Sequence, residues 1–300
     1  MVFKNFKELI LSVQALKEKK RVAVVVAHDE HTLQAVCKAS KDNIAEPILI
    51  GNKLKIKEAL HNIKESIADS AIIDAASDAE AAMKAVELIH ENKADFIMKG
   101  KIQTADLLKA VVNKEKGLRT GSVMSHVVLH EIPTYHKLLV ITDGGMMMYP
   151  NLAEKKQIIE NAVNSLLSLG YDKPKVAVLA AVENVNPKMP EAVDAGLLKE
   201  MNQKGEIKNC IVEGPISYDL AMSKDAAKIK GYESPVTEDA DILMVPNITV
   251  GNIMGKALVY SAGAKIAGFI VGAKVPIVLT SRGSSAEEKY LSLVLSAAAK

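Results

Sequence analysis

Short apolar runs rich in Val and Ile recur along the chain and constrain its fold more than any other feature. A strand with one face in water alternates apolar and polar residues, whereas a strand covered on both faces is apolar throughout. Several runs lack this alternation, so we predict strands that are buried on both faces. The predicted strands are 22–27, 47–51, 71–75, 95–100, 122–129, 137–142, 175–182, 210–214, 241–246, 267–272 and 276–280.

Helical patterns separate most of these runs. Residues 77–92 begin with Ser77 and Glu80, which have the spacing of a capping box. Residues 152–170 end at Gly170, which is typical of a helix stop. Strands that alternate with helices predict an α/β fold with largely parallel sheets.

Two pairs of predicted strands are too close in sequence to have a helix between them, and these pairs lie within 122–142 and 267–280. We predict a hairpin at each. Residues 1–20 carry Lys throughout and apolar residues at helical spacing, which favours an amphipathic helix over a signal peptide.

The composition excludes several classes of protein. The 38 basic and 36 acidic residues nearly balance, and there is no Trp, which argues against a nucleic-acid binder with a basic face or a base-stacking platform. Cys37 and Cys210 are too few and too far apart for a disulfide framework or a zinc site. No apolar run approaches the roughly 18 residues of a membrane span. We therefore expect a cytoplasmic protein that binds neither nucleic acid nor membrane.

Ligands of parallel α/β sheets bind beyond the carboxyl ends of the strands. Gly, Asn, Ser and basic residues dominate the positions that follow the predicted strands. These positions are 28–29, 99–101, 142–143, 214–215, 246–247 and 281–282. This profile predicts an anionic ligand held by backbone N–H groups and helix N-termini.

The last strand runs into Ser281 and Arg282, and a helix follows. Arg282 is suited to a bidentate contact with phosphate, and Ser281 to donating a hydrogen bond. The alternative is that Arg282 is a surface cation. Ser284 and Glu287 have the spacing of a capping box, which would leave Glu288 as the freer carboxylate.

The stretch 247–263 superficially resembles an ATP-binding loop, because Gly251 and Gly255 precede Lys256. A P-loop needs four residues between its glycines and a Ser or Thr after its Lys, and both are missing here. We expect a helix to begin just after Asn252, so that Asn252 and Lys256 reach a bound anion. The alternative is a buried helix that packs through its small residues.

Residues 98–126 carry side chains that suit a phosphate or coenzyme groove, namely Lys99, Lys101, Thr104, Lys109 and Arg119. The alternative is a solvated basic face.

At 28–31, "HDEH" has too few partners for a metal site, and Asp29 is better explained as a helix N-cap. At 142–151, the methionines of "TDGGMMMYPN" are either core residues or the lining of an acyl pocket.

Five stretches, taken together and in order, resemble the phosphate acetyl/butyryltransferase family, and its butyryltransferase branch most closely. They are MKGKIQTADLLKAVVNKEKGLRTGSVMSH, TDGGMMMYPNLAEKKQIIENA, VEGPISYDLA, VPNITVGNIMGKALV and TSRGSS. The likeness runs from about Met98 to the C-terminus, and the strand pattern before it also fits.

The resemblance implies two α/β/α domains with an active cleft between them, a fold like that of isocitrate and isopropylmalate dehydrogenases. We expect residues 1–133 and 273–300 to form the first domain and 134–272 the second. The family transfers an acyl group between coenzyme A and inorganic phosphate, as a homodimer or larger homo-oligomer, with coenzyme A as substrate and no metal or bound cofactor.

The resemblance also assigns roles to residues near the C-terminus. Ser281 and Arg282 match the family's Ser-Arg pair, so that Ser281 would donate to the thioester carbonyl and Arg282 would hold phosphate. Glu288 stands where the acetyl branch has an Asp base, seven residues beyond that Ser. Glu287 offers an alternative register for the base that takes the proton from the coenzyme A thiol.

Asn252 and Lys256 match the family's GNxxxKA pattern and would bind the acyl phosphate. Thr104 matches a Thr near the phosphate, and we expect Arg119 to bind phosphate as well. The near alternative is a phosphate acetyltransferase, which differs in the volume of its acyl pocket. The distant alternative is a metal-dependent dehydrogenase of the isocitrate or isopropylmalate type, which would need clustered Asp residues.

Overall fold

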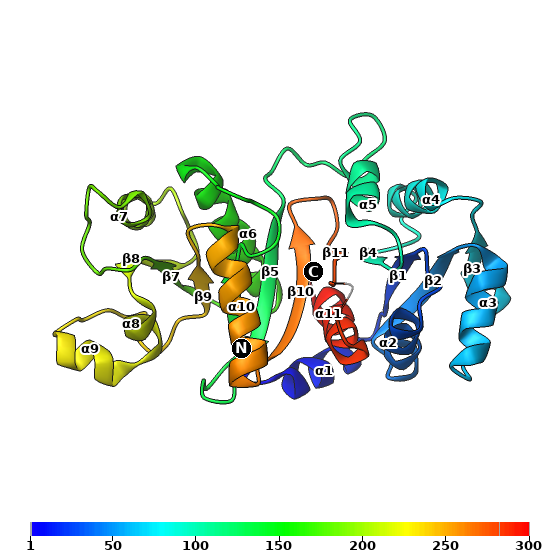
Figure 1. The fold of residues 1–300 in the computed structure, drawn as a ribbon, viewed down its shortest axis with the longest axis horizontal. Coiled ribbons are helices and arrows are strands. Elements are labelled where there is room, and N and C mark those ends of the chain that lie inside the picture. Colours follow the sequence, from blue (N-terminus) through cyan, green and yellow to red (C-terminus); the bar gives the residue numbers. More distant parts are fainter. Residues whose placement is uncertain (1, 282, 300) are drawn as a thin grey trace. The chain divides into compact units, whose positions relative to one another are not determined.

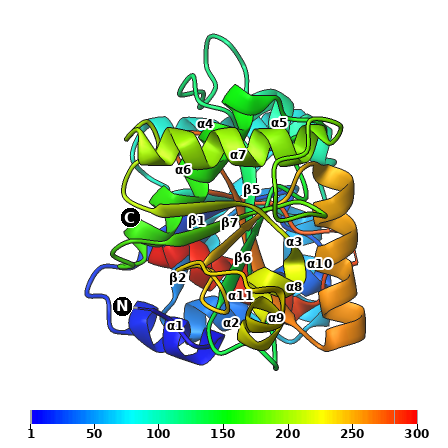
Figure 2. The ribbon, with the colours of Figure 1, turned by 90° about the vertical axis from the view of Figure 1, so that its left-hand side faces the viewer.

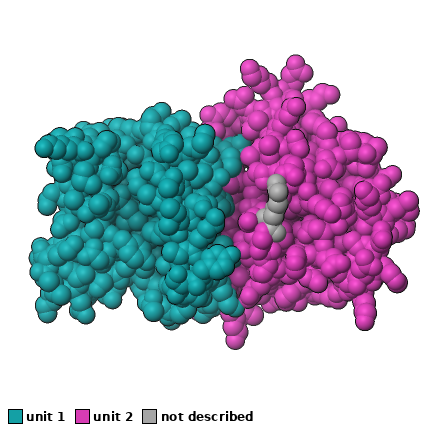
Figure 3. All heavy atoms as spheres, in the orientation of Figure 1, with its two compact units in different colours: residues 1–5, 123–266 teal, residues 6–122, 267–300 magenta. Residues whose placement is uncertain are grey.

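The structure is a computed structural model, and it describes residues 2–281 and 283–299. The chain divides into two compact units (Figure 3), which are Met1–Asn5 with Val123–Ile266 (unit 1) and Phe6–Ser122 with Ala267–Lys300 (unit 2). Both consist of strands covered by helices, so the predicted α/β class is confirmed. All eleven predicted strands are present, with boundaries shifted by a few residues.

Unit 2 contains a largely parallel group of strands. They are β1 (Lys20–Val25), β2 (Ala45–Gly51), β3 (Ile72–Asp74), β4 (Phe96–Lys99), β11 (Ile277–Val278) and most of β10 (Lys265–Val271). Their order is β3-β2-β1-β4-β11-β10, and the first five are parallel to one another. β10 runs antiparallel to β11, which confirms the predicted hairpin.

Helices cover both faces of these strands (Figure 1). They are α1 (Phe6–Gln14), α2 (Glu30–Lys41), α3 (Lys53–Asn62), α4 (Asp78–His90), α5 (Thr104–Val111) and α11 (Ala286–Ala298), with a 3-10 turn, η1, at Asp69–Ala71. α11 packs against α2 and α1, whereas α4 packs against α5 on the other face. Nine consecutive residues of α11, from Lys289 to Ala297, are buried, so its first turn has a fixed place in the unit.

Unit 1 is built in the same way. Its strands are β5 (Ser125–Glu131), β6 (Leu139–Thr142), β7 (Lys175–Leu179), β8 (Ile211–Ile216) and β9 (Ile242–Met244), in the order β5-β6-β9-β7-β8. β5 and β6 form the predicted antiparallel hairpin, and the other pairs are parallel. Its helices are α6 (Leu152–Ser168), α7 (Pro190–Gln203), α8 (Tyr218–Met222), α9 (Lys224–Lys230) and α10 (Ile248–Ala262). Figure 2 shows α6 and α7 on one face, and α8 and α9 on the other.

Helix caps confirm part of the sequence analysis. Asp29 caps α2 by accepting a hydrogen bond from the Thr32 N–H at 2.9 Å, as predicted. Ser77 caps α4, but the Glu80 carboxylate accepts from the Ala76 N–H instead of the Ser77 N–H. The predicted capping box of α4 is therefore only half formed, because its return bond reaches one residue further back.

The start of α10 corrects a prediction. Asn247 is the N-cap, and its side chain accepts a hydrogen bond from the Val250 N–H at 3.1 Å. Asn has a strong preference for this position, and α10 therefore begins at Ile248 and not after Asn252. Gly251 and Asn252 lie inside the helix as a result.

Gly251 is needed for close packing between α10 and the loop after β6. A Cβ atom placed on Gly251 would lie 2.7 Å from the Gly144 Cα and 3.0 Å from the Asp143 carbonyl oxygen. Both of these are backbone atoms, which cannot move aside as a flexible side chain can. Gly255, one turn later, has room, because its Cβ would lie 3.5 Å from His130 Nε2.

We predict opposite effects for Gly251→Ala and Gly255→Ala. Gly251→Ala should lower the free energy of unfolding by about 1–3 kcal/mol, the usual cost of overpacking. Gly255→Ala should leave it unchanged or raise it by up to about 1 kcal/mol, because Ala is the better helix former. Urea unfolding of both variants measures the difference. Equal effects of the two substitutions would contradict the packing described for Gly251.

Candidate active site

The topology of unit 2 brings several predicted site residues to one edge. β1, β4 and β11 are parallel neighbours, so their carboxyl ends meet at the same edge. The chain runs from β1 outward through β2 and β3, and β4 then pairs with the other side of β1. Such a reversal of strand order leaves the loops beyond the strands free to form a ligand crevice. His28, Lys101, Thr104 and Ser281 all lie in or next to these loops.

The loops after β1 and β4 are joined by their backbones. The Gly100 N–H donates to the Val25 carbonyl at 2.9 Å, and the Lys101 N–H donates to the Val26 carbonyl at 3.0 Å. A Cβ on Gly100 would lie 2.4 Å from the Val26 carbonyl oxygen, so only glycine fits. Val26 itself has φ +58°, which a β-branched residue rarely adopts. The backbone at this edge of unit 2 is therefore closely packed at Gly100 and adopts a rare conformation at Val26.

The β1 loop contains polar atoms that the sequence analysis missed. Five buried side-chain atoms find no hydrogen-bond partner among residues 2–281 and 283–299. Three of them lie within five residues of one another, namely His28 Nδ1, Asp29 Oδ2 and Thr32 Oγ1. Burial lowers the pKa of His28, and the nearby Lys101 and Lys55 lower it further, so the imidazole is neutral at pH 7. The position of "HDEH" directly after a predicted strand is the one sequence signal that points to this cluster.

Ser281 lies at the end of the short segment that follows β11. Its side chain is exposed, its Oγ accepts from the Gly283 N–H at 3.4 Å, and its carbonyl accepts from the Ser284 N–H at 3.1 Å. The preceding Thr280 accepts a hydrogen bond at 2.9 Å from Nζ of the buried Lys289. Arg282 lies outside the described residues, so its role stays a prediction.

The cap of α11 corrects the predicted roles of its serines and glutamates. The N-cap is Ser285 and not Ser284, and its Oγ accepts from the Glu288 N–H at 3.1 Å. The predicted pairing of Ser284 with Glu287 is wrong because the helix begins one residue later than expected, at Ala286. Ser284 instead donates its hydroxyl to Glu288 Oε1 at 2.6 Å.

Glu288 consequently occupies a more restrained environment than Glu287. Burial raises the pKa of Glu288, while the hydrogen bond from Ser284 and the charge of Lys289 oppose that rise. Glu287 is exposed in the first turn of the same helix. A half-buried carboxyl with a raised pKa is a feature that general bases share.

In the segment 98–126, most of the side chains proposed for a phosphate or coenzyme groove lie on the surface. Thr104 is exposed as the first residue of α5. Lys109 and Arg119 are exposed, and Arg119 pairs through its backbone with Ala273. Lys99, in contrast, is buried at the end of β4. The surface is therefore basic and solvated, with one cation drawn into the edge where the parallel strands end.

In unit 1, Asn252 and Lys256 are exposed on α10. The Asn252 Nδ2 donates to the Gly144 carbonyl at 3.3 Å, in the loop that follows β6. That loop is held by the buried Asp143, whose carboxylate accepts the backbone N–H groups of Gly145, Met146, Met147 and His126 at 2.7–3.2 Å. Asp143 therefore determines the shape of the backbone that Asn252 contacts.

Two histidines of β5 lie beneath these elements, and the sequence analysis did not single them out. A Cβ on Gly145 would lie 2.4 Å from His126 Nδ1, so the loop packs directly on that imidazole. Burial lowers the pKa of His126, and it lowers the pKa of His130 to about 4. Both imidazole rings are therefore neutral at pH 7. They pack beneath the loop after β6 and beneath α10 without adding positive charge there.

Two alternatives raised for unit 1 are wrong. Gly251 is the single buried residue of α10, so α10 is not a buried helix, although Gly251 does pack closely. Ile253 and Tyr260 are 63% and 83% exposed. Met148 is 67% exposed, and Met146 and Met147 are half-buried, so the methionine run is not core. Their role as an acyl pocket stays a prediction.

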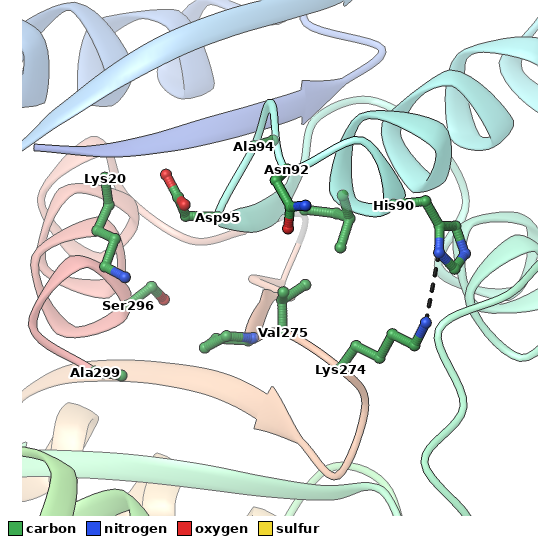
Figure 4. Close-up of a pocket in the computed structure, with 11 residues that line it drawn as sticks. Lys20, His90, Asn92, Ala94, Asp95, Lys274, Val275, Ser296 and Ala299 are labelled. Carbon is green, nitrogen blue, oxygen red and sulfur yellow. Dashed lines mark hydrogen bonds between the residues drawn. The ribbon is translucent and has the colours of Figure 1, made fainter.

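A pocket of about 480 Å³ in unit 2 lies at the other ends of the strands (Figure 4). Lys20 begins β1, Asp95 precedes β4, and Val275 precedes β11, so the pocket is at their amino ends. Across it, Lys274 Nζ lies 3.4 Å from His90 Nδ1. Ligands of parallel sheets bind at the carboxyl ends, so we do not assign the active site to this pocket.

Within 2–281 and 283–299, no group of three or more His, Cys, Asp or Glu side chains is arranged to hold a metal ion. The helices of the same residues include none with both the length and the apolar character that a membrane crossing requires.

Comparisons with known proteins agree with the resemblance seen in the sequence. Residues 5–83 and 75–297 match the family described as phosphate acetyl/butaryl transferase. A phosphate butyryltransferase of Clostridium acetobutylicum is 44% identical over 296 residues, which cover 99% of this chain and 98% of that protein. A phosphate acetyltransferase of Thermotoga maritima is 45% identical, covering 93% of this chain and 94% of that protein.

The fold comparison is consistent with these matches. The crystal structure of a branched-chain phosphotransacylase from Enterococcus faecalis V583 matches with a TM-score of 0.82 and 35% identity, covering 93% of this chain and 98% of that one. Sequence and fold agree over nearly the whole length. The chain belongs to the phosphate acetyl/butyryltransferase family.

Proposed function

We propose that the protein is a phosphate butyryltransferase, which converts butyryl-CoA and phosphate reversibly into butyryl phosphate and coenzyme A. The family and its named relatives support an acyltransferase that uses acyl-CoA and phosphate. The observation that carries the proposal is Glu288, a half-buried carboxyl seven residues beyond Ser281 at the carboxyl edge of unit 2. A phosphate acetyltransferase is the second candidate, because one such relative is equally similar.

Glu288 acts as the general base in this proposal. A free thiol has a pKa of about 8.5 and is mostly protonated at neutral pH, so a base must remove its proton before attack. Burial raises the pKa of Glu288 and brings it closer to that of the thiol, which makes the proton transfer less unfavourable. The thiolate sulfur then attacks the carbonyl carbon of the acyl phosphate, and phosphate leaves.

Negative charge develops on the carbonyl oxygen and on the departing phosphate during that attack. The exposed hydroxyl of Ser281 is suited to donate to the carbonyl oxygen, and we assign the phosphate to Arg282, as the family pattern implies. Thr104 and Arg119 supply a hydroxyl and a guanidinium on the same unit. The neutral His28 and the exposed Lys101 belong to the same edge and extend its anion-binding surface.

Asn252 and Lys256 contribute from unit 1. They lie four residues apart on α10, so their side chains leave the helix on the same side. In the proposed reaction they hold the acyl phosphate, with the Asn252 amide oriented by the Gly144 carbonyl. In the proposed reaction, the interdomain cleft expected from the sequence would let the bound acyl phosphate meet the coenzyme A thiol held by unit 2.

We further infer that the protein self-associates through α10. Val250, Ile253, Ala257 and Tyr260 are exposed and follow the 3-4-3 spacing of a coiled-coil seam. Lys256 is the one charged residue of α10, so the seam itself carries no charge that would repel an identical seam. A second copy related by a two-fold axis offers the same stripe and buries the apolar side chains of both helices.

Glu288→Gln tests the base directly. It should lower kcat by roughly 10²–10⁴-fold, the usual contribution of a positioned general base. Glu287→Gln, the matched control on the same helical turn, should change kcat little. The assay is phosphate-dependent release of the coenzyme A thiol from butyryl-CoA, in the presence of EDTA to separate it from metal-dependent chemistry. A large loss in Glu287→Gln alone would move the base by one residue, and no phosphate-dependent release from butyryl-CoA or acetyl-CoA would refute the function.

The acyl preference is tested by comparing kcat/KM for acetyl-, propionyl- and butyryl-CoA. We expect the value to rise with each added methylene, because a filled methylene site contributes about 1–3 kcal/mol of discrimination. A preference for acetyl-CoA would favour the second candidate and leave the reaction class unchanged.

Ile253→Lys tests the self-association. Analytical ultracentrifugation should show a dimer or larger assembly for the wild type and a monomer for Ile253→Lys, because a buried charge in the seam is costly. Ile229→Lys is the control, since Ile229 is 87% exposed on α9 and lies outside the seam. A monomeric wild type, or an assembly that survives Ile253→Lys, would contradict the inference.

A further inference from the structure

We propose that Ser284 is a positioning residue that holds the Glu288 carboxylate in place for proton transfer. The proposal rests on the proposed function, in which Glu288 is the base. It assigns a role to a serine that neither the Ser-Arg pair nor the helix cap uses.

The contact is direct and partly buried. Ser284 is 5% exposed, and its Oγ lies 2.6 Å from Glu288 Oε1. A hydroxyl that donates to a carboxylate makes a short, charge-assisted hydrogen bond, which is stronger than a neutral one. Because the bond engages Oε1, the other carboxylate oxygen stays available to receive a proton. A Glu side chain has three rotatable bonds, so this contact removes much of its freedom.

Ser284 also connects the two residues that the reaction needs. Its backbone N–H donates to the Ser281 carbonyl at 3.1 Å, while its side chain donates to Glu288. Ser284 is thus hydrogen-bonded both to Ser281, which we propose donates to the carbonyl oxygen, and to Glu288, which we propose takes the thiol proton. Positioning of this kind matters because small displacements of reacting groups are costly in rate.

The neighbouring Ser285 serves a different purpose although it is the same residue type. Its Oγ accepts from the backbone N–H of Glu288 and does not contact the carboxylate in the described hydrogen bonds. The chain therefore offers a matched pair. Ser284→Ala removes the contact with the carboxylate, and Ser285→Ala removes the cap of the same helix.

The charges around Glu288 stay the same in both variants. On α11, the neighbouring Lys289 favours the ionised form of Glu288. Asp29, the N-cap of α2, acts on Lys289, while Lys38 and the C-cap Asp42 contact Tyr290 at the other end of that helix. From the end of β11, Thr280 accepts from Lys289. Any shift in titration that is specific to Ser284→Ala therefore reports the lost hydroxyl.

The sign of the pH effect follows from the hydrogen bond. The Ser284 hydroxyl stabilises the ionised carboxylate and so opposes the rise in the Glu288 pKa that burial causes. Its removal lets that pKa rise further. The base acts in its ionised form, so the acidic limb of the pH–rate profile should move to higher pH in Ser284→Ala.

The experiment measures kcat, KM and the pH profile of kcat/KM for butyryl phosphate plus coenzyme A. Ser284→Ala should lower kcat about tenfold at neutral pH, as expected for a lost hydrogen bond to a charged group, with little change in the KM for coenzyme A. Its acidic limb should move to higher pH. Ser284→Thr keeps a hydroxyl and should restore both. Ser285→Ala should lower the melting temperature by about 2 °C and leave the limb in place.

Each other outcome overturns the proposal. If Ser284→Ala and Ser285→Ala lose rate alike without moving the limb, Ser284 is merely structural. If Ser284→Thr fails to restore the profile although it folds, the hydroxyl is not the cause. If Glu288→Gln keeps wild-type activity, the base assignment fails and the role of Ser284 with it, whereas an unshifted limb with an inactive Glu288→Gln refutes only the positioning.

Discussion

Burial of β1, β4 and β11 on both faces is the constraint on which the candidate site of unit 2 depends. Strands that are covered on both sides must run between two helical layers, and their parallel pairing brings their carboxyl ends to one edge. The reversal of strand order at β1 leaves that edge open. Residues as distant in sequence as His28, Lys101 and Ser281 therefore share one edge without any direct sequence relation.

Close backbone approach gives each unit a rigid foundation beneath its polar groups. In unit 2 it joins Gly100 to Val26, and in unit 1 it joins Gly251 to Gly144. In both places a methyl group would meet backbone atoms. The close packing of Gly251 on Gly144 brings the neighbouring Asn252 within reach of the Gly144 carbonyl. The orientation of Asn252, a proposed binding residue, therefore depends on Gly251.

The sequence was sufficient to predict the eleven strands, both hairpins and the position of the polar groups at strand ends, because apolar runs and their order determine these features. It was insufficient where two residues of the same type, close in sequence, could each cap or begin the same helix. Ser284 and Ser285 are equivalent in sequence, and the packing of α11 decides which of them caps the helix. Asn247 and Asn252 competed in the same way for the start of α10. The orphaned atoms of the β1 loop depend on tertiary burial, which no local pattern encodes.

Glu80, Glu154 and Glu288 each occupy the third position of their helix, and comparing these three explains what is special about α11. Glu154 of α6 accepts the Asn151 N–H, and Glu80 of α4 accepts the Ala76 N–H, so both carboxylates complete a helix cap. The pKa of Glu80 is lowered, chiefly by Lys84 and then by that backbone contact. Glu288 stands at the same position of α11, but its carboxylate is bonded by the Ser284 hydroxyl and is half-buried, so its pKa is raised. The Glu that completes a helix cap in α4 and α6 is thus free of that task in α11. Its carboxylate is held instead at the carboxyl edge of unit 2, where the proposed reaction needs a proton acceptor.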